Sequence, residues 1–172
     1  MRRARVLVAD PPWKFGDKLP GPGRGAEKHY QTMTLAEICT FALPPLADDA
    51  WLFLWRVSAM PAEALAVVKA WGFVPKSEIV WRKTTNDGTR LRIGMGRSVR
   101  LAHETAIIAT RGKPERLDAS IPSVFDAPRG RHSQKPELFY SIVERFARGP
   151  HTELFARRRR SGWDCRGLEV DG

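Results

Sequence analysis

Short apolar runs alternate with polar loops along this chain and predict an alternation of strands and helices. Runs that are too short for helices and rich in aliphatic and aromatic residues predict strands at residues 6–9, 50–55, 74–81, 105–110, 153–157 and 166–170. Amphipathic patterns of helical period predict helices at residues 34–42, 62–71 and 136–147. We therefore expect an α/β fold, with helices flanking a mostly parallel central sheet and residues 50–55 near its middle.

Several helix boundaries carry their own signals. Thr34 and Glu37 form the pattern of a capping box at the start of the first helix. The second helix is expected to end at Gly72 and to bury Leu65, Val68 and Trp71. Pro136 suits the first position of the third helix, whose expected apolar face consists of Leu138, Phe139, Ile142, Val143 and Phe146. Residues 121–131 show neither period and are expected to be irregular.

Length and charge narrow the class of protein. The 172 residues have the size of one domain, so we expect a single domain spanning residues 1–172. The net charge of +10 predicts a surface that attracts polyanions such as nucleic acids. The 2 cysteines and 4 histidines lack the spacing of metal ligands, so no metal is expected. Without a long apolar stretch or a signal-peptide pattern, we expect a cytoplasmic protein with no membrane partner.

The stretch with the most distinctive chemistry is Asp10-Pro11-Pro12-Trp13, at the end of the first predicted strand. Proline has no N–H and fixes φ, so the chain must leave the sheet here with its carbonyls exposed. Open α/β sheets bind their ligands at the carboxyl ends of strands. We therefore expect this tetrad to present a carboxylate, a free carbonyl and an indole to a ligand.

These groups suit the alkylation of an exocyclic amine on a purine. Such an amine is a poor nucleophile because its lone pair is delocalised into the ring. Asp10 can accept one N–H and the Pro11 carbonyl the other, at the place where positive charge develops. Trp13 can stack on the base, which is worth about 1–3 kcal/mol. The alternative is an ordinary strand-to-turn junction with a packed tryptophan.

The tetrad after an apolar strand resembles the catalytic motif of the MT-A70 family of S-adenosylmethionine-dependent N6-adenine methyltransferases. Further motifs follow in the family's order: Tyr-x-Thr-Met at 30–33, His-Glu at 103–104, Lys-Pro at 135–136, Phe-Ala-Arg at 155–157 and Gly-x-Glu at 167–169. The resemblance implies a Rossmann-like methyltransferase fold in permuted order, with the catalytic motif before the cofactor-binding strands. It also implies S-adenosylmethionine as cofactor, direct methyl transfer without a metal, and a catalytic set of Asp10, Pro11, Pro12 and Trp13.

The same resemblance implies which residues contact the cofactor. Lys135 is expected to contact its methionine carboxylate or ribose, and Glu169 its ribose, although Leu168 replaces the asparagine that the family often has. The four consecutive arginines at 157–160 either hold the methionine carboxylate or face nucleic acid. The full set of implied cofactor contacts is Asp10, Ser123, Val124, Lys135, Phe155, Arg157, Arg159, Arg160 and Glu169.

Two loops are candidates for substrate binding. Residues 14–33 form a long polar loop that can close over a flipped base, and its Tyr30 either contacts base or cofactor or anchors the loop. Residues 82–100 are rich in arginine, which suits contacts with phosphates; a solvated loop is the alternative. The implied substrate contacts are Trp13, Tyr30, Arg82, Lys83, Arg97 and Glu104.

Several functional alternatives remain open. The lack of a recognisable RNA-binding module slightly favours DNA, whose target base would have to be flipped, over RNA. A subunit that only presents nucleic acid to an active partner is another alternative, although the tetrad is intact. A basic nucleic-acid-binding protein without activity would leave the Lys-Pro and Phe-Ala-Arg motifs unexplained. The resemblance further implies a homodimer or a heterodimer.

Overall fold

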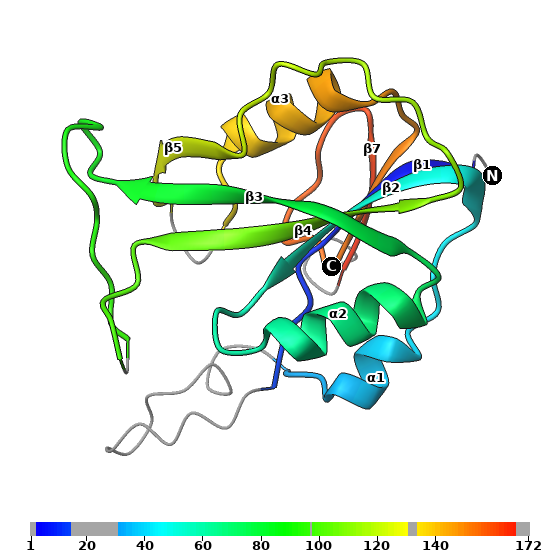
Figure 1. Ribbon diagram of the computed structural model, residues 1–172, viewed down its shortest axis with the longest axis horizontal. Coiled ribbons are helices and arrows are strands. Elements are labelled where there is room, and N and C mark those ends of the chain that lie inside the picture. Colours follow the sequence, from blue (N-terminus) through cyan, green and yellow to red (C-terminus); the bar gives the residue numbers. More distant parts are fainter. Residues whose placement is uncertain (1–2, 15–30, 97, 131–133, 168–172) are drawn as a thin grey trace.

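Strands form one sheet flanked by helices in the computed structural model, which describes residues 3–14, 31–96, 98–130 and 134–167 (Figure 1). The strands are β1 (Ala4–Ala9), β2 (Leu46–Arg56), β3 (Val74–Thr84), β4 (His103–Arg111), β5 (Val124–Pro128), β6 (His151–Leu154) and β7 (Trp163–Arg166). The helices are α1 (Leu35–Cys39), α2 (Pro61–Ala70) and α3 (Glu137–Phe146). None of the helices described is long and apolar enough to cross a membrane.

The sheet is mostly parallel, as expected. Its strand order is β5-β3-β4-β2-β1-β6-β7. Only β4 runs against its neighbours, because it pairs antiparallel with both β2 and β3. Strand β1 lies between β2 and β6, so that Val8 is in register with Phe53 on one side and Glu153 on the other. The carboxyl ends of the first and sixth strands therefore lie side by side, although most of the chain separates them.

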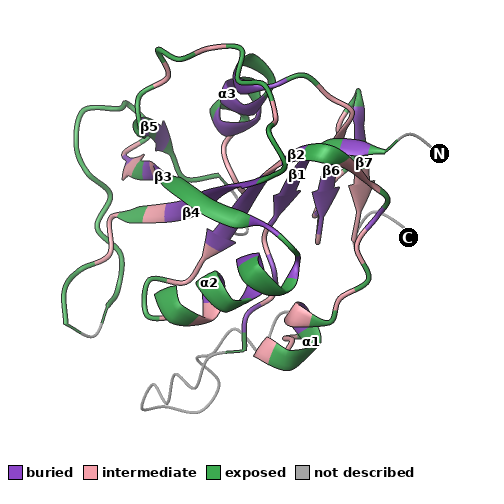
Figure 2. Cartoon of the chain, turned by 45° about the vertical axis from the view of Figure 1, so that its right-hand side comes forward, coloured by how far each residue is buried: buried purple, intermediate pink, exposed green. Residues whose placement is uncertain are grey.

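Helices cover both faces of the sheet and create two cores. Helix α3 packs on one face and buries Phe139 with Val8 and Phe53. Helices α1 and α2 cover the other face, where Leu7 and Val68 are buried. The buried residues concentrate on the central strands and on the inward side of α3 (Figure 2). Because successive strand residues point to opposite faces, the alternation along β1 assigns Asp10, two residues after Val8, to the face covered by α3.

The helix signals are largely confirmed. Thr34 and Glu37 form the capping box: Glu37 N donates to Thr34 Oγ1 over 3.3 Å, and Thr34 N donates to Glu37 Oε2 over 2.7 Å. Gly72 follows α2 with φ of 79°, which a residue with a side chain adopts at a cost. Two expected core residues are instead exposed, Leu65 at 47% and Leu138 at 45%. In α2 the buried face is built by smaller residues, which include Ala64.

One strand was missed by the sequence prediction. Residues 124–128 were expected to be irregular but form the edge strand β5, whose residues alternate between exposed and buried. An edge strand that is covered on one face needs only two inward apolar residues, here Phe125 and Ala127. Its sequence pattern therefore gives only a weak prediction of a strand. The last strand was expected at 166–170; β7 spans Trp163–Arg166, and residues 168–170 lie outside the described residues.

Candidate active site

A buried lysine joins two acids at the carboxyl edge of the sheet. Asp10 follows β1, Glu104 is the second residue of the reversed strand β4, and Lys135 precedes α3. The Lys135 Nζ lies 2.8 Å from Asp10 Oδ2 and 2.8 Å from Glu104 Oε2, and the lysine side chain is only 8% exposed. The ion pair engages Oδ2 of Asp10, so Oδ1 is the oxygen that can accept from an incoming donor.

The ion pairs continue along the sheet edge in alternating sign. Lys83, near the end of β3, has its Nζ 2.7 Å from Glu104 Oε1. The ammonium groups of Lys135 and Lys83 also lie over indole rings, at 4.9 Å from the centroid of Trp55 and 5.2 Å from that of Trp81. Cations above aromatic faces are stabilised by the ring quadrupole. Lys83, Glu104, Lys135 and Asp10 therefore form a charged row of alternating sign, and its two lysines lie over the rings of Trp81 and Trp55.

Ion pairing keeps Glu104 and Lys135 charged despite their burial. Burial alone would raise the pKa of the Glu104 carboxyl, but the charges of Lys135 and Lys83 outweigh it and lower that pKa to about 2. Burial likewise opposes the charged form of Lys135, yet Asp10 and Glu104 raise the pKa of its ammonium. Asp10 is thus paired with the charged ammonium of Lys135 in a largely buried environment.

The tetrad makes a tight turn that ties it to the segment after the long loop. Trp13 N donates to the Pro11 carbonyl over 2.8 Å, so this oxygen already accepts one bond. The Pro12 carbonyl accepts from Met33 N over 2.7 Å, and Lys14 N donates to the Met33 carbonyl over 2.9 Å. The sequence had predicted bare carbonyls. A carbonyl oxygen has two lone pairs, so that of Pro11 retains capacity for one more donor.

Trp13 is not an exposed stacking surface in this structure. Its side chain belongs to the core on the α1 and α2 face, and the residue is 6% exposed. The indole Nε1 donates to the Trp55 carbonyl over 3.1 Å. Trp13 therefore fixes the end of β1 to the end of β2, which differs from the stacking on a base that the sequence suggested.

A small cavity opens beside Asp10. Its volume of about 20 Å³ holds roughly one water molecule. Four of its lining residues were predicted from the sequence: Asp10, Lys135, Phe155 and Arg157. Phe155 has φ of 60°, a strained conformation for a residue with a side chain, directly after β6. Parallel pairing of β1 with β6 brings this residue and Asp10 to the same edge.

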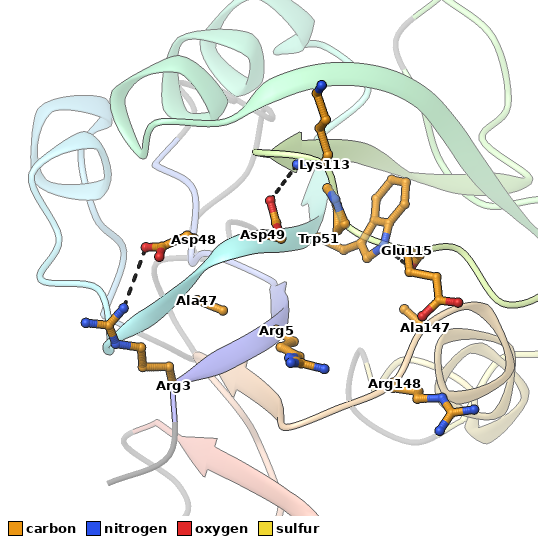
Figure 3. A pocket seen from close by; sticks show the side chains of 11 residues that line it. Arg3, Arg5, Ala47, Asp48, Asp49, Trp51, Lys113, Glu115, Ala147 and Arg148 are labelled. Carbon is orange, nitrogen blue, oxygen red and sulfur yellow. Dashed lines mark hydrogen bonds and ion pairs between the residues drawn. The ribbon is translucent and has the colours of Figure 1, made fainter.

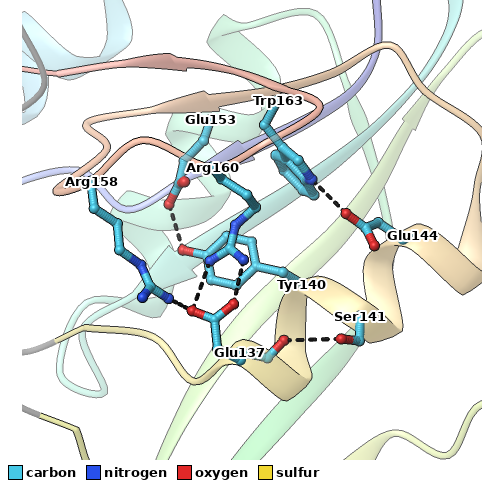
Figure 4. Close-up of polar contacts among 8 residues, drawn as sticks. All are labelled: Glu137, Tyr140, Ser141, Glu144, Glu153, Arg158, Arg160 and Trp163. Carbon is cyan, nitrogen blue, oxygen red and sulfur yellow. Dashed lines mark hydrogen bonds and ion pairs between the residues drawn. The ribbon is translucent and has the colours of Figure 1, made fainter.

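Sequence reasoning missed Gln134, Tyr140 and Glu153, which also line this cavity. The Tyr140 hydroxyl donates to Glu153 Oε1 over 2.6 Å (Figure 4). Burial raises the pKa of the Glu153 carboxyl and also that of the Tyr140 hydroxyl. The signal in the sequence was Glu153, an acid inside a short apolar strand. A charged group is costly to bury there unless it has a partner or a function.

Arginines after β6 close over this pair. Arg158 and Arg160 both form ion pairs with Glu137 in the first turn of α3 (Figure 4). The Arg160 guanidinium also lies 3.5 Å from the centroid of the Tyr140 ring. Of the arginines predicted to bind cofactor, Arg157 lines the cavity, Arg160 is held by Glu137, and Arg159 is exposed. They are therefore not equivalent.

Other predicted residues are not brought to Asp10. Ser123 and Val124 stand at the start of β5, with β3, β4 and β2 between them and β1. At about 4.8 Å per strand this separation is roughly 19 Å, so the fold does not support their predicted contact with the cofactor. Arg82 forms an ion pair with Asp126 of β5, at 2.5 Å between Nη2 and Oδ2. The predictions for Tyr30, Arg97 and Glu169 lie outside the described residues.

A larger cavity lies elsewhere, at the amino end of β1 and β2. It measures about 450 Å³ (Figure 3). Several of its polar groups serve the local structure. Asp49 accepts from Lys113 N over 2.7 Å, and Trp51 Nε1 donates to the Glu115 carbonyl over 2.9 Å. These bonds fasten the segment after β4, and the cavity is separate from the charged row.

The fold and the position of the site together define a class. A mostly parallel sheet between helices, with buried charges at the carboxyl ends of adjacent strands, is the architecture of Rossmann-like nucleotide and cofactor sites. The sequence profile of the MT-A70 family matches residues 4–169, and the chain belongs to this family. The Rossmann-like methyltransferase fold expected from the sequence is thus confirmed.

Curated relatives include proteins from bacteria and animals. The N(6)-adenosine-methyltransferase MT-A70-like protein of Drosophila melanogaster is 30% identical over 97% of this chain, and the match covers 27% of that protein. The human N(6)-adenosine-methyltransferase catalytic subunit METTL3 is 29% identical over 97% of the chain and 28% of its own length. The type II methyltransferase M.MunI of Mycoplasma sp is 28% identical over 98% of the chain and 78% of its own length. The chain thus spans under a third of the two animal relatives but most of the bacterial one.

Proposed function

We propose that this chain transfers a methyl group from S-adenosylmethionine to N6 of adenine in nucleic acid, with DNA as the preferred substrate. The observation that carries the proposal is the ion pair of Asp10 with the buried Lys135, at the edge where β1 and β6 end together. It supplies a fixed carboxylate beside a cavity with both acidic and basic groups. Family membership supports the same chemistry.

The cavity has the polar groups that the amino-acid end of the cofactor needs. Lys135 and Arg157 line it as cations and suit a carboxylate, while Asp10 and Glu153 suit an ammonium group. S-adenosylmethionine, when bound, supplies a methyl group on a positively charged sulfur. Because the cavity is small and Arg158 at its wall is tied to Glu137, binding requires the arginine segment to move away from α3.

Asp10 acts on the substrate amine. Its Oδ1 accepts an N–H of the adenine N6, the remaining lone pair of the Pro11 carbonyl accepts the other, and both favour the pyramidal nitrogen. Asp10 or water takes the proton when the N6–carbon bond has formed and the carbon–sulfur bond has broken. Lys135 holds Asp10 in place through their ion pair. Preorganised acceptors of this kind need no rearrangement during the reaction.

DNA is proposed as the substrate because this chain covers 78% of the type II methyltransferase, against under a third of the animal relatives. The net charge of +10 suits either polyanion. RNA is the second candidate, and the names of the animal relatives, N(6)-adenosine-methyltransferases, favour it. A subunit without its own activity would not need the intact tetrad and its ion pair.

Nucleoside analysis tests the proposal. Wild-type protein is incubated with S-adenosylmethionine and either DNA or RNA, and the digested nucleosides are examined by mass spectrometry for N6-methyladenine. Asp10→Asn is expected to lower the rate at least a hundredfold, about 3 kcal/mol, as for the loss of a charge-stabilising contact. Asp118→Asn, which removes an acid paired with Arg145 far from the site, is the matched control and should keep the wild-type rate. Equal rates for Asp10→Asn and wild type would remove Asp10 from the mechanism.

A further inference from the structure

An arm of the chain exposes an unusual concentration of apolar side chains. The arm is the connection between β3 and β4, of which the structure describes residues 85–96 and 98–102, and it extends away from the sheet (Figure 1). Its exposed apolar residues are Leu91 at 48%, Ile93 at 64%, Met95 at 65% and Val99 at 70%. Apolar surface in contact with water is unfavourable, and a cluster of it marks a surface that binds something.

The arm has a defined shape although its side chains are exposed. Arg92 N donates to the Lys83 carbonyl over 2.8 Å, and Gly94 N donates to the Leu101 carbonyl over 2.7 Å. At Gly96 an added Cβ would lie 2.0 Å from the Val99 carbonyl oxygen, so only glycine allows the two halves to approach this closely. The backbone therefore presents the apolar residues on a fixed support.

Arginines alternate with these apolar positions and indicate that the partner is negatively charged. Arg90, Arg92 and Arg100 are exposed and form no ion pair with any acid in the described part of the chain. The acid Asp87 is occupied at the base of the arm, where it accepts from Thr85 and Thr89. A second copy of this chain, itself at +10, would bring like charges together. Nucleic acid offers phosphates to the arginines and apolar base faces to the side chains between them.

The root of the arm is part of the site. Lys83 precedes the arm and Glu104 follows it, and these two residues are joined by an ion pair of 2.7 Å. Glu104 in turn binds Lys135, which holds Asp10. The root of the arm therefore adjoins the site, and a duplex long enough to span both reaches the arm and Asp10 together.

We propose that the arm is a wedge for duplex DNA: Ile93 and Met95 insert between base pairs beside the target adenine, while Arg92 and Arg100 hold the flanking phosphates. An adenine inside a duplex cannot reach Asp10 unless it leaves the stack, and inserted side chains stabilise the gap that it leaves. The inference rests on the proposed function and names the form of its substrate.

The test separates insertion from simple binding. Ile93→Ser/Met95→Ser removes the apolar tips and keeps every arginine, while Leu65→Ser/Leu138→Ser removes two comparably exposed apolar residues on helices as the matched control. Closed circular DNA is relaxed by a topoisomerase with each protein at equal occupancy, because inserted side chains unwind the duplex and change its linking number. We expect the wedge variant to unwind at least fivefold less than wild type and the control to unwind equally.

Methylation supplies the second readout. The wedge variant is expected to lower the ratio of duplex to single-strand activity at least tenfold and to leave single-strand activity within about twofold. Unchanged unwinding together with an unchanged ratio would overturn the wedge. A wild-type dimer that the wedge variant converts to a monomer, measured by light scattering, would overturn it in favour of contact between copies, and activity on RNA alone would also overturn it. If wild type methylates no nucleic acid, the proposed function fails, whereas the unwinding result still decides the wedge.

Discussion

Lys135 and Asp10 are far apart in the sequence, yet their Nζ and Oδ2 atoms lie 2.8 Å apart at the carboxyl edge of the sheet. The lysine is also shared with Glu104, so one buried cation is balanced by two acids. This relationship orders the carboxylate that we propose to act on adenine, and removing the shared cation would leave buried charge uncompensated.

Replacing Lys135 should be far more damaging than replacing Lys83. Lys135→Met leaves two acids buried without their shared cation, and the free energy of unfolding should fall by about 3–5 kcal/mol. Lys83→Met leaves Glu104 paired with Lys135, and the loss should stay near ~1 kcal/mol. Urea unfolding followed by tryptophan fluorescence measures both. Lys135→Arg, which keeps the charge, should recover part of the loss, and equal losses for the two methionine variants would contradict this account.

Glu104 should make the protein sensitive to acid. Its pKa is lowered from the ordinary range to about 2, so its contribution is present above about pH 4.5 and is lost as the pH falls towards 2. A shift of this size corresponds to about 3 kcal/mol. Glu104→Gln should therefore be less stable than wild type at pH 7, and the difference should shrink between pH 4.5 and pH 2. Unfolding free energies at several pH values check this, and a difference independent of pH would refute it.

Replacing Glu153 should stabilise the fold but weaken cofactor binding. Burial raises the pKa of its carboxyl, so the ionised form opposes folding above the ordinary pKa of a glutamate. Glu153→Gln keeps an acceptor for the Tyr140 hydroxyl and should raise the melting temperature at pH 8. It should also weaken the binding of S-adenosylhomocysteine, measured by calorimetry, at least fivefold. Glu144→Gln, at the acid that accepts from Trp163 on the far part of α3, is the control for cofactor binding.

Trp13 offers a test of its role as a packing residue. Trp13→Phe keeps an aromatic ring in the core but removes the bond to the Trp55 carbonyl, which should lower the free energy of unfolding by about 1 kcal/mol or slightly more. Methyl transfer, measured below the unfolding temperature, should fall less than fivefold because the ring faces the core. A loss of a hundredfold in rate with unchanged stability would instead restore the idea that Trp13 stacks on the base.

The sequence by itself determined the elements and most of the chemistry. Continuous apolar runs fixed the central strands, the capping box at Thr34 fixed the start of α1, and two prolines after Asp10 required the chain to leave the sheet there. These features depend on neighbouring residues only, and local patterns therefore reveal them. The motif order of the MT-A70 family added Lys135, Phe155 and Arg157 to Asp10, and the structure places all four at one cavity.

Only the tertiary structure decided which of these residues meet. Insertion of β1 between β2 and β6 sets Asp10 beside Phe155, whereas the position of β5 at the sheet edge removes Ser123 and Val124 from the site. Burial of Trp13 and the bond between Tyr140 and Glu153 likewise depend on how α3 and the strands pack. Strand order and side-chain burial are properties of long-range pairing, and such pairing leaves no periodic signal in the chain.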